Sequence, residues 1–397
     1  MKCNFCPTDV AEWDKRTGAH LTITESLDGH IHTHGPVDNK EHLEHLLDSV
    51  KESFGLNGTS HGKLPFKEVI FHNRQRLGDI LMFTCGVRDF KKAYPHIKVG
   101  VMSTAMHIWD NNPYVDLSLK PFYKDGITIE SATAKDLLDG KTNILKIGPG
   151  KLTNASNRLD WHFSNAYRMS IEEKLSINIP QSESWPDIWL TQEEYDAPRV
   201  TDKPYWIIIT GGEKGWGCKM YPYVRWQEFV DQNPNILFYQ LGTRGDNHER
   251  LSGANIVDYI GKTEDKQTGI RDLFKLFLNA EGSIGLISFH MHLSGALRKP
   301  CVVVAGAREP VSFTRYAGHQ YIANDGCLPC AITACWHCDI SACTNLVDRD
   351  GKAFKFPIGE NLKPVVTEAD KKNVMPKCVD MIKSDEITRY LRRYYDG

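Results

Sequence analysis

The sequence predicts an α/β protein with two parallel sheets, and three observations support this. Short apolar runs of strand length alternate with longer segments in helical spacing, and the alternation occurs twice. A polar stretch between the two alternations is interrupted by prolines at positions 180, 186, 198 and 204. The 397 residues, 41% of them hydrophobic, suffice for two or three domains of roughly 100–200 residues each. We therefore expect two facing Rossmann-type doubly wound domains.

The first alternation begins at Glu68–His72, a β-branched apolar run with the length of a buried strand. The sequence Arg76-Leu-Gly-Asp79 then opens a segment whose apolar residues suit a helix packed on that strand. Ile97–Met102 has the pattern of the next strand. Ser170–Glu173 has the Ser-x-x-Glu form of a capping box, which predicts the start of another helix. This order favours parallel strands joined by crossover helices.

The second alternation begins at the apolar run Tyr205–Ile209. Further strands are expected at Ile236–Tyr239, Ser283–Ile287 and Cys301–Val304, and helices at Val224–Val230 and Ile270–Asn279. The tail at 384–395 has its apolar residues on one helical face, which predicts a closing helix. We expect a small Cys/His-rich module at 1–64, a first domain with its linker at 65–200, a second domain at 201–365 with a cysteine-rich insert at 327–343, and a helical tail at 366–397.

Charge and cysteine content exclude several classes of protein. The 48 basic and 50 acidic side chains give a net charge of −2, which argues against broad electrostatic capture of nucleic acid. No apolar run approaches the ~18–20 residues of a membrane helix, and the first ten residues are too polar for a secretion signal. We expect no transmembrane segment and a cytoplasmic location. The eleven cysteines, an odd number, then favour metal ligands or reduced thiols over disulfides.

Three loops at the carboxyl ends of the predicted strands are candidate ligand sites, because doubly wound sheets bind ligands at that edge. Asp79 is either a helix N-cap or a carboxylate that accepts a proton from an attacking hydroxyl. The glycine-rich loop Thr210–Lys219 permits close backbone approach and ends in a lysine suited to phosphate. His290 and His292 follow the third strand end and are either ligand contacts or satisfied residues at a helix start.

Several motifs occur in a fixed order along the chain. They are Arg76-Leu-Gly-Asp79, Lys219-Met-Tyr-Pro222 with Trp226-Gln-Glu-Phe229, Gly261-Lys-Thr263, His292-Leu-Ser-Gly-Ala296, and Lys299-Pro300 with Gly306. This ordered set resembles glycosyltransferase family 9, the heptosyltransferase family of lipopolysaccharide core assembly, from about Lys67 to the C-terminus. The resemblance implies a GT-B fold, with an acceptor domain first and a nucleotide-sugar domain second. It also implies inverting transfer without a catalytic metal or redox cofactor.

The resemblance also implies roles for individual residues. Asp79 is the expected general base, and Lys219 the cation that stabilises the leaving diphosphate. The expected contacts of a nucleotide-diphosphate sugar are Thr210, Gly211, Gly212, Gly242, Gly261, Lys262, Thr263, His290, His292 and Gly306. One departure stands out: Ile287 occupies the place where family members usually carry an acidic residue. His290 is a candidate to replace part of that role.

Two cysteine-containing segments predict structural zinc. Cys327, Cys330, Cys335 and Cys338 have the spacing C-x2-C-x4-C-x2-C, in which thiolate pairs can chelate one tetrahedral ion. Cys343 is a fifth thiol nearby, and an iron–sulfur cluster or unligated thiols are the alternatives. Near the N-terminus, the candidate Cys2His2 set is Cys3, Cys6, His32 and His34. Its alternative is a histidine-rich exposed loop.

The sequence therefore predicts an inverting glycosyltransferase that moves a sugar from a nucleotide-diphosphate sugar to an acceptor hydroxyl. The acceptor is either a surface glycan or a hydroxylated base in DNA, such as 5-hydroxymethylcytosine. Cations that would serve a DNA cleft are Lys214, Lys219, Arg225 and Arg244. A third hypothesis is a non-catalytic protein that binds a nucleotide sugar or a nucleic acid.

Overall fold

The computed structural model describes residues 22–25, 31–34, 64–149, 162–212, 215–263, 269–324, 335–336, 339–360 and 365–395. The chain divides into two compact units, Met1–His61 and Gly62–Gly397. In the first unit, β1 (Thr22–Glu25) and β2 (Ile31–His34) pair antiparallel. The other elements described below belong to the second unit.

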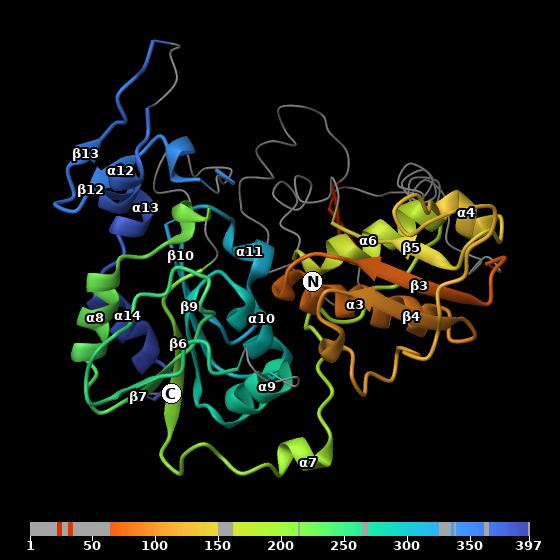
Figure 1. Ribbon diagram of the computed structural model, residues 1–397, viewed down its shortest axis with the longest axis horizontal. Helices are drawn as coiled ribbons and strands as arrows, with labels where there is room; N and C mark the ends of the chain where they lie inside the picture. Colours follow the sequence, from red (N-terminus) through yellow and green to blue (C-terminus); the bar gives the residue numbers. More distant parts are fainter. Residues whose placement is uncertain are drawn as a thin grey trace. The chain divides into compact units, whose positions relative to one another are not determined.

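The larger sheet of the second unit has six parallel strands in the order β11-β10-β9-β6-β7-β8 (Figure 1). This is the order of a doubly wound sheet, in which the chain reverses its direction of travel at the pair β6 and β9. The strands are β6 (Tyr205–Ile209), β7 (Leu237–Gln240), β8 (Ile256–Asp258), β9 (Gly282–Leu286), β10 (Cys301–Gly306) and β11 (Gln320–Ala323). The four strands predicted in this region are confirmed as β6, β7, β9 and β10. We call this sheet with its helices the second lobe.

Helices cover both faces of this sheet (Figure 1). On one face, α8 (Tyr223–Asp231) and α14 (Ser384–Arg392) pack together, and on the other lie α9 (Gly269–Asn279) and α10 (Phe289–Ala296). Residues of β6 alternate between the two faces, as the period of a strand requires. Trp206 and Ile208 belong to the core cluster with Trp226, Ile387 and Leu391, whereas Tyr205 and Ile207 belong to the cluster with Phe274 and Leu293. Both faces are therefore buried, which explains the nearly continuous apolar run of this strand.

A smaller sheet begins the second unit, with three parallel strands in the order β4-β3-β5. These are β3 (Glu68–Asn73), β4 (Lys98–Ser103) and β5 (Ile144–Lys146), and the first two confirm the strands predicted in this region. Helix α3 (Leu77–Ala93) follows β3 directly and packs against α6 (Ser164–Leu175). The turn between β3 and α3 therefore places Asp79 at the carboxyl end of β3. We call this region the first lobe.

The helix expected to begin at Ser170 begins six residues earlier, at Ser164. Ser170 lies inside α6 and is 4% exposed, so its Ser-x-x-Glu pattern does not cap a helix. Ala166 and Tyr167 already bury their side chains in the core, and this packing extends the helix toward the N-terminus.

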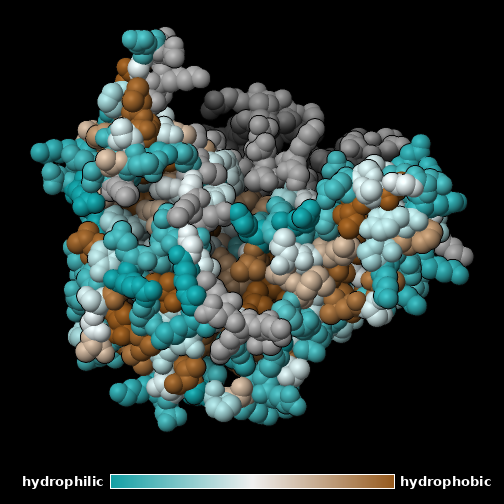
Figure 2. All heavy atoms as spheres, viewed as in Figure 1, coloured by the Kyte–Doolittle hydropathy of each residue, from teal (hydrophilic) through white to brown (hydrophobic). Residues whose placement is uncertain are grey.

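The remaining described elements are short. They are η1 (Met106–Ile108), α4 (Ala134–Leu138), α7 (Gln192–Tyr195), η2 (Gly217–Lys219), α11 (Val311–Thr314), η4 (Ile340–Ala342), β12 (Leu346–Asp348), β13 (Ala353–Phe354), α12 (Glu368–Asn373), β14 (Val374–Pro376) and α13 (Lys377–Asp380). Strands β13, β12 and β14 form an antiparallel sheet that the sequence analysis did not predict. None of the described helices combines the length and hydrophobicity needed to cross a membrane. Hydrophilic side chains cover much of the face seen in Figure 2.

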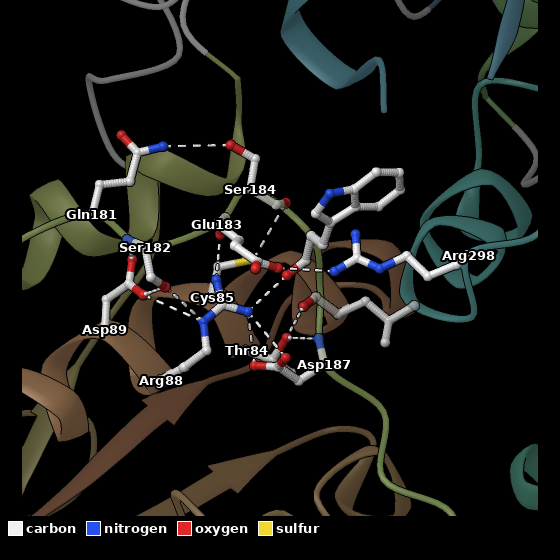
Figure 3. A network of polar contacts seen from close by, with 12 residues as sticks. Thr84, Cys85, Arg88, Asp89, Gln181, Ser182, Glu183, Ser184, Asp187 and Arg298 are labelled. Atoms are coloured by element: carbon white, nitrogen blue, oxygen red, sulfur yellow. Dashed lines mark hydrogen bonds and ion pairs between the residues drawn. The ribbon is translucent and has the colours of Figure 1, made fainter. Parts of the chain in front are cut away.

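The segment after α6 is fixed to α3 by the guanidinium of Arg88, which is 4% exposed (Figure 3). Arg88 Nη1 lies 3.0 Å from both carboxylate oxygens of Asp187 and donates to the carbonyl of Trp185 at 2.8 Å. Arg88 also donates to the carbonyl of Glu183 and pairs with Asp89. From the second lobe, Arg298 reaches Glu183 at 2.9 Å and lies 3.9 Å from the Trp185 ring centroid. This linker segment, residues 182–187, therefore contacts both lobes.

Candidate functional site

Asp79 is the third residue of α3, and Arg76 occupies the N-cap position, so the N-cap interpretation of Asp79 is wrong. The hydroxyl of Tyr167 donates to Asp79 Oδ1 at 3.1 Å, and the backbone N–H of Arg76 donates to the same carboxylate. Burial raises the pKa of Asp79 above its ordinary value, and the two hydrogen bonds and the charge of Lys219 only partly oppose that rise. A carboxylate with a raised pKa binds a proton more readily and is the stronger base.

A cavity of about 400 Å³ opens beside Asp79. It is lined by Arg74, Gln75, Arg76, Leu77, Asp79 and Thr104. Thr104 Oγ1 donates to the carbonyl of Gln75 at 2.8 Å, which ties the turn after β3 to the end of β4. The carboxylate therefore borders a space that can hold an acceptor group.

Lys219 ends the short helix η2, and its ammonium forms an ion pair that the sequence analysis missed. Lys219 Nζ lies 2.7 Å from Glu309 Oε1, and Glu309, which is 4% exposed, also pairs with Arg308. The charges of both Lys219 and Glu309 act on Asp79, so these groups share one electrostatic environment although they come from different lobes. The only hint of Glu309 in the sequence is its position three residues after Gly306, at the end of β10.

His292 lies between the same two lobes. A Cβ added at Gly78, in the first turn of α3, would meet the His292 ring at 3.0 Å, so the glycine allows this close approach. His292 Nδ1 lies 2.8 Å from the hydroxyl of Tyr316. Burial lowers the pKa of His292 well below its ordinary value of 6.5, so the ring is neutral at pH 7. When Tyr316 donates to Nδ1, Nε2 carries the proton and can donate to a ligand.

His290 lies in the core of the second lobe, where it is fully buried. Its Nδ1 lies 2.9 Å from Ser283 Oγ, and its Nε2 lies 2.7 Å from the carbonyl of Leu286. Both ring nitrogens therefore have protein partners, which supports the interpretation of His290 as a satisfied helix residue. Ile287 is buried as well, and a carboxylate that does lie at this sheet edge is that of Glu309.

Acid should unfold this protein partly through His290. Burial lowers its pKa to about 4, against 6.5 in an unfolded chain, so protons bind the unfolded state preferentially as the pH falls below 6.5. This group should lower the free energy of unfolding by up to about 1.4 kcal/mol per pH unit between pH 6.5 and 4. Urea unfolding between pH 7 and 5 should show that the free energy of unfolding falls less steeply with pH in His290→Gln than in the wild type. The half-exposed His107→Gln is the control, and an unchanged slope in His290→Gln would contradict the assignment.

Apart from the two histidines of α10, the predicted donor contacts lie on the loops after β6, β7 and β8 and, for Gly306, at the last position of β10. Gly211 is required sterically, because a Cβ there would stand 1.7 Å from the carbonyl oxygen of Asn247. Gly261 N donates to the carbonyl of Gly242 at 2.9 Å, so two of these loops touch. The other predicted contacts lie at the same strand ends: buried Thr210 and Gly306, half-buried Gly212 and Thr263, and exposed Lys262. Contact between these residues and a nucleotide-diphosphate sugar stays a prediction.

Solved structures of glycosyltransferases match this chain. No protein-family model matches it, and neither does any curated protein. A glycosyl transferase family 9 protein from Veillonella parvula DSM 2008 is 16% identical, with a TM-score of 0.53 over 84% of this chain and 99% of that chain. The heptosyltransferase TibC from enterotoxigenic E. coli is 15% identical, with a TM-score of 0.52 over 84% of this chain and 76% of that chain. TibC is described as dodecameric and iron-containing, and this structure was solved with ADP-D-beta-D-heptose. E. coli ADP-heptose LPS heptosyltransferase II is 13% identical, with a TM-score of 0.52 over 83% of this chain and 98% of that chain.

The chain has the GT-B fold of these glycosyltransferases. This finding confirms the predicted fold and, at the level of the fold, the resemblance to glycosyltransferase family 9. The site described above combines side chains that follow strands of both lobes. Asp79 comes from the first lobe, and Lys219, Glu309 and His292 come from the second.

The metal predictions lie mostly outside the described residues. Cys3, Cys6, Cys327, Cys330 and Cys338 are not among them, and His32 and His34 belong to strand β2. Cys335 is described and half-buried. Within the described ranges, no three His, Cys, Asp or Glu side chains form a group suited to a metal ion. Structural zinc stays a prediction at both segments.

Tyr167→Phe should move the acid limb of the pH–rate profile to higher pH. The Tyr167 hydrogen bond lowers the pKa of Asp79, so its loss lets burial raise that pKa further. A more alkaline solution is then needed to keep the carboxylate of this predicted base ionised. Initial rates of the predicted sugar transfer, measured between pH 4 and 9, give the position of this acid limb. Tyr221→Phe, which loses a buried hydrogen bond to the Ile382 carbonyl in the second lobe, is the control and should keep the wild-type limb. If Tyr167→Phe kept the acid limb of the wild type, the predicted effect of Tyr167 on Asp79 would be contradicted.

Proposed function

We propose that this protein is an inverting glycosyltransferase that transfers a sugar from a nucleotide-diphosphate sugar to an acceptor hydroxyl. One observation carries the proposal: Asp79 and Lys219 come from different lobes of a GT-B fold, and the charge of Lys219 favours the ionised carboxylate of Asp79. A base on one side of the sugar and a cation on the other are the two charges that inverting transfer needs.

In the proposed reaction, the acceptor hydroxyl binds in the cavity beside Asp79. As its oxygen attacks the anomeric carbon, Asp79 accepts the hydroxyl proton, and the bond from that carbon to the diphosphate breaks. Negative charge grows on the departing nucleoside diphosphate, and Lys219 stabilises it. His292, neutral and close to the first turn of α3, is positioned to donate a hydrogen bond to the donor. Attack on the face opposite the leaving group inverts the anomeric configuration.

The acceptor that we propose is a glycan. Two of the cations considered for a DNA cleft have partners within the protein, since Arg225 pairs with Asp380 and Arg244 donates to the carbonyl of Gly261 at 3.1 Å. A hydroxylated DNA base stays an alternative outcome of the test. The similarity to a structure solved with ADP-D-beta-D-heptose supports ADP-linked sugars as the first donors to try.

The test offers the 397-residue chain a panel of ADP-, UDP- and GDP-sugars with either a lipopolysaccharide-type oligosaccharide or 5-hydroxymethylcytosine DNA. Nucleotide release and the mass of the acceptor are measured together. Release coupled to a gain of one sugar on the oligosaccharide supports the proposal. A gain of one sugar on the DNA would identify DNA as the acceptor in place of the glycan. Nucleotide-sugar binding without nucleotide release for every pair would favour a non-catalytic binding protein.

A further inference from the structure

Glu309 is a buried carboxylate that the proposed reaction does not yet use. It follows β10 and lies against two cations, Lys219 at 2.7 Å and its neighbour Arg308. Burial alone raises the pKa of Glu309, but the charges of Lys219 and Arg308 outweigh it and hold the pKa below its ordinary value. Glu309 is therefore ionised at neutral pH. A buried ionised carboxylate is costly unless it is paired, so separating Glu309 from its two cations would be unfavourable.

The ring of Trp216 restrains the same two cations. Lys219 Nζ lies 4.8 Å from the Trp216 ring centroid, and the guanidinium carbon of Arg308 lies 5.0 Å from it. Arg308 also donates to the carbonyl of Trp336 at 3.3 Å. Glu309 and the Trp216 face thus hold the Lys219 ammonium on two sides. An ammonium group has three N–H donors, so donors remain for a ligand.

The net charge of this cluster still favours an anion. Lys219 and Arg308 contribute two positive charges and Glu309 one negative charge, which leaves one net positive charge. The cluster can therefore attract a diphosphate while its lysine is held in place. Lysine is otherwise a flexible point charge, and a positioned charge does not need to reorganise as the reaction proceeds.

We infer that Glu309 is a positioning residue that holds the Lys219 ammonium where charge develops on the leaving nucleoside diphosphate. The inference rests on the proposed glycosyl transfer. It predicts that Glu309 contributes to turnover through Lys219, and that it contributes little to binding of the donor.

The variants to compare are Glu309→Gln, Glu309→Asp, Lys219→Met and the double variant Glu309→Gln with Lys219→Met. Glu194→Gln is the matched control, since Glu194 also pairs with a buried arginine, Arg271, but belongs to α7 and lies outside the cluster of Lys219, Arg308 and Glu309. Binding of ADP, GDP and UDP is measured first, by calorimetry and by tryptophan fluorescence, for which Trp216 is a local reporter. The kcat and the donor KM are then measured with the active nucleotide sugar.

Glu309→Gln should lower kcat by about tenfold or more, less than the ~10²–10³-fold loss typical of removing a stabilising group outright. The donor KM should change by less than about threefold, because ground-state binding is kept. In the Lys219→Met background, Glu309→Gln should lower kcat no further, since it acts through that lysine. Glu309→Asp keeps the charge balance needed for folding, and its kcat should lie between those of the wild type and Glu309→Gln.

Two results would overturn the inference alone: wild-type kcat in both Glu309 variants, or effects of Glu309→Gln and Lys219→Met that multiply in the double variant. Failure of the wild-type protein to bind any of the three nucleotides would overturn the proposed function, and this inference with it. The binding measurement therefore separates the two failures.

Discussion

Replacing Asp79 with asparagine should lower kcat for sugar transfer by ~10²–10⁴-fold, the usual contribution of a general base. Asparagine has the same shape and keeps an oxygen that accepts the Tyr167 hydrogen bond, but its amide cannot take a proton from the acceptor. Because the carboxylate is half-buried and its pKa is raised by that burial, loss of its charge should not destabilise the helix start by more than ~1 kcal/mol. The measurements are the initial rate of nucleotide release with acceptor present and the thermal melting curve.

The pH dependence gives a second readout of the same variant. The wild-type rate should fall as the pH falls through the raised pKa of Asp79, and the remaining activity of Asp79→Asn should lack that acid limb. Asp136→Asn is the control, since Asp136 is also the third residue of a helix, α4, but its carboxylate accepts hydrogen bonds from Thr133 of its own helix start and does not line the cavity beside Asp79. A folded Asp79→Asn variant with near-normal turnover would remove Asp79 from the role of base.

Replacing Arg88 with methionine should lower the free energy of unfolding by ~3–5 kcal/mol, the range measured when one partner of a buried ion pair is removed. The change leaves the carboxylates of Asp89 and Asp187 without their cation, Asp89 being 2% exposed. It also removes the donor to the carbonyls of Glu183 and Trp185 (Figure 3). Guanidinium or urea unfolding at pH 7 measures the loss.

Arg298→Met is the matched control for Arg88→Met. Arg298 contacts the same linker, but its side chain is 50% exposed and its partner Glu183 is 62% exposed, so its ion pair should contribute less than ~1 kcal/mol. If Arg88→Met and Arg298→Met lowered the free energy of unfolding equally, the linker would not be anchored through buried charge. The anchoring has a functional consequence, because Arg88 lies on the same helix whose first turn carries Asp79.

Much of the fold could be predicted because its signals are local. Each strand of the second lobe that was predicted is a short apolar run, such as Tyr205–Ile209, and the predicted helices α9 and α14 bury residues in helical spacing. The error at Ser170 has the complementary cause. A capping box is a local pattern, but the extent of α6 was decided by the burial of Ala166 and Tyr167 against residues distant in the sequence.

The candidate site was only partly predictable for the same reason. Asp79 and Lys219 stand in motifs at strand ends, so their residue types and positions marked them. Glu309 and Tyr167 belong to no such motif, and their importance arises only from what they touch: Lys219 for Glu309, and Asp79 for Tyr167. His290 shows the reverse case, since its place in the sequence suggested a ligand contact but its ring is enclosed by Ser283 and Leu286.

The amino-acid sequence by itself determined the alternation of strands and helices, the two lobes and the chemical types of two candidate reacting groups, because hydrophobic periodicity and strand-end motifs are properties of short segments. The tertiary structure alone decided which charges meet. Whether a carboxylate is a base, a cap or the partner of a lysine depends on its burial and on neighbours up to hundreds of residues away, and only the folded chain brings those neighbours within a few ångströms.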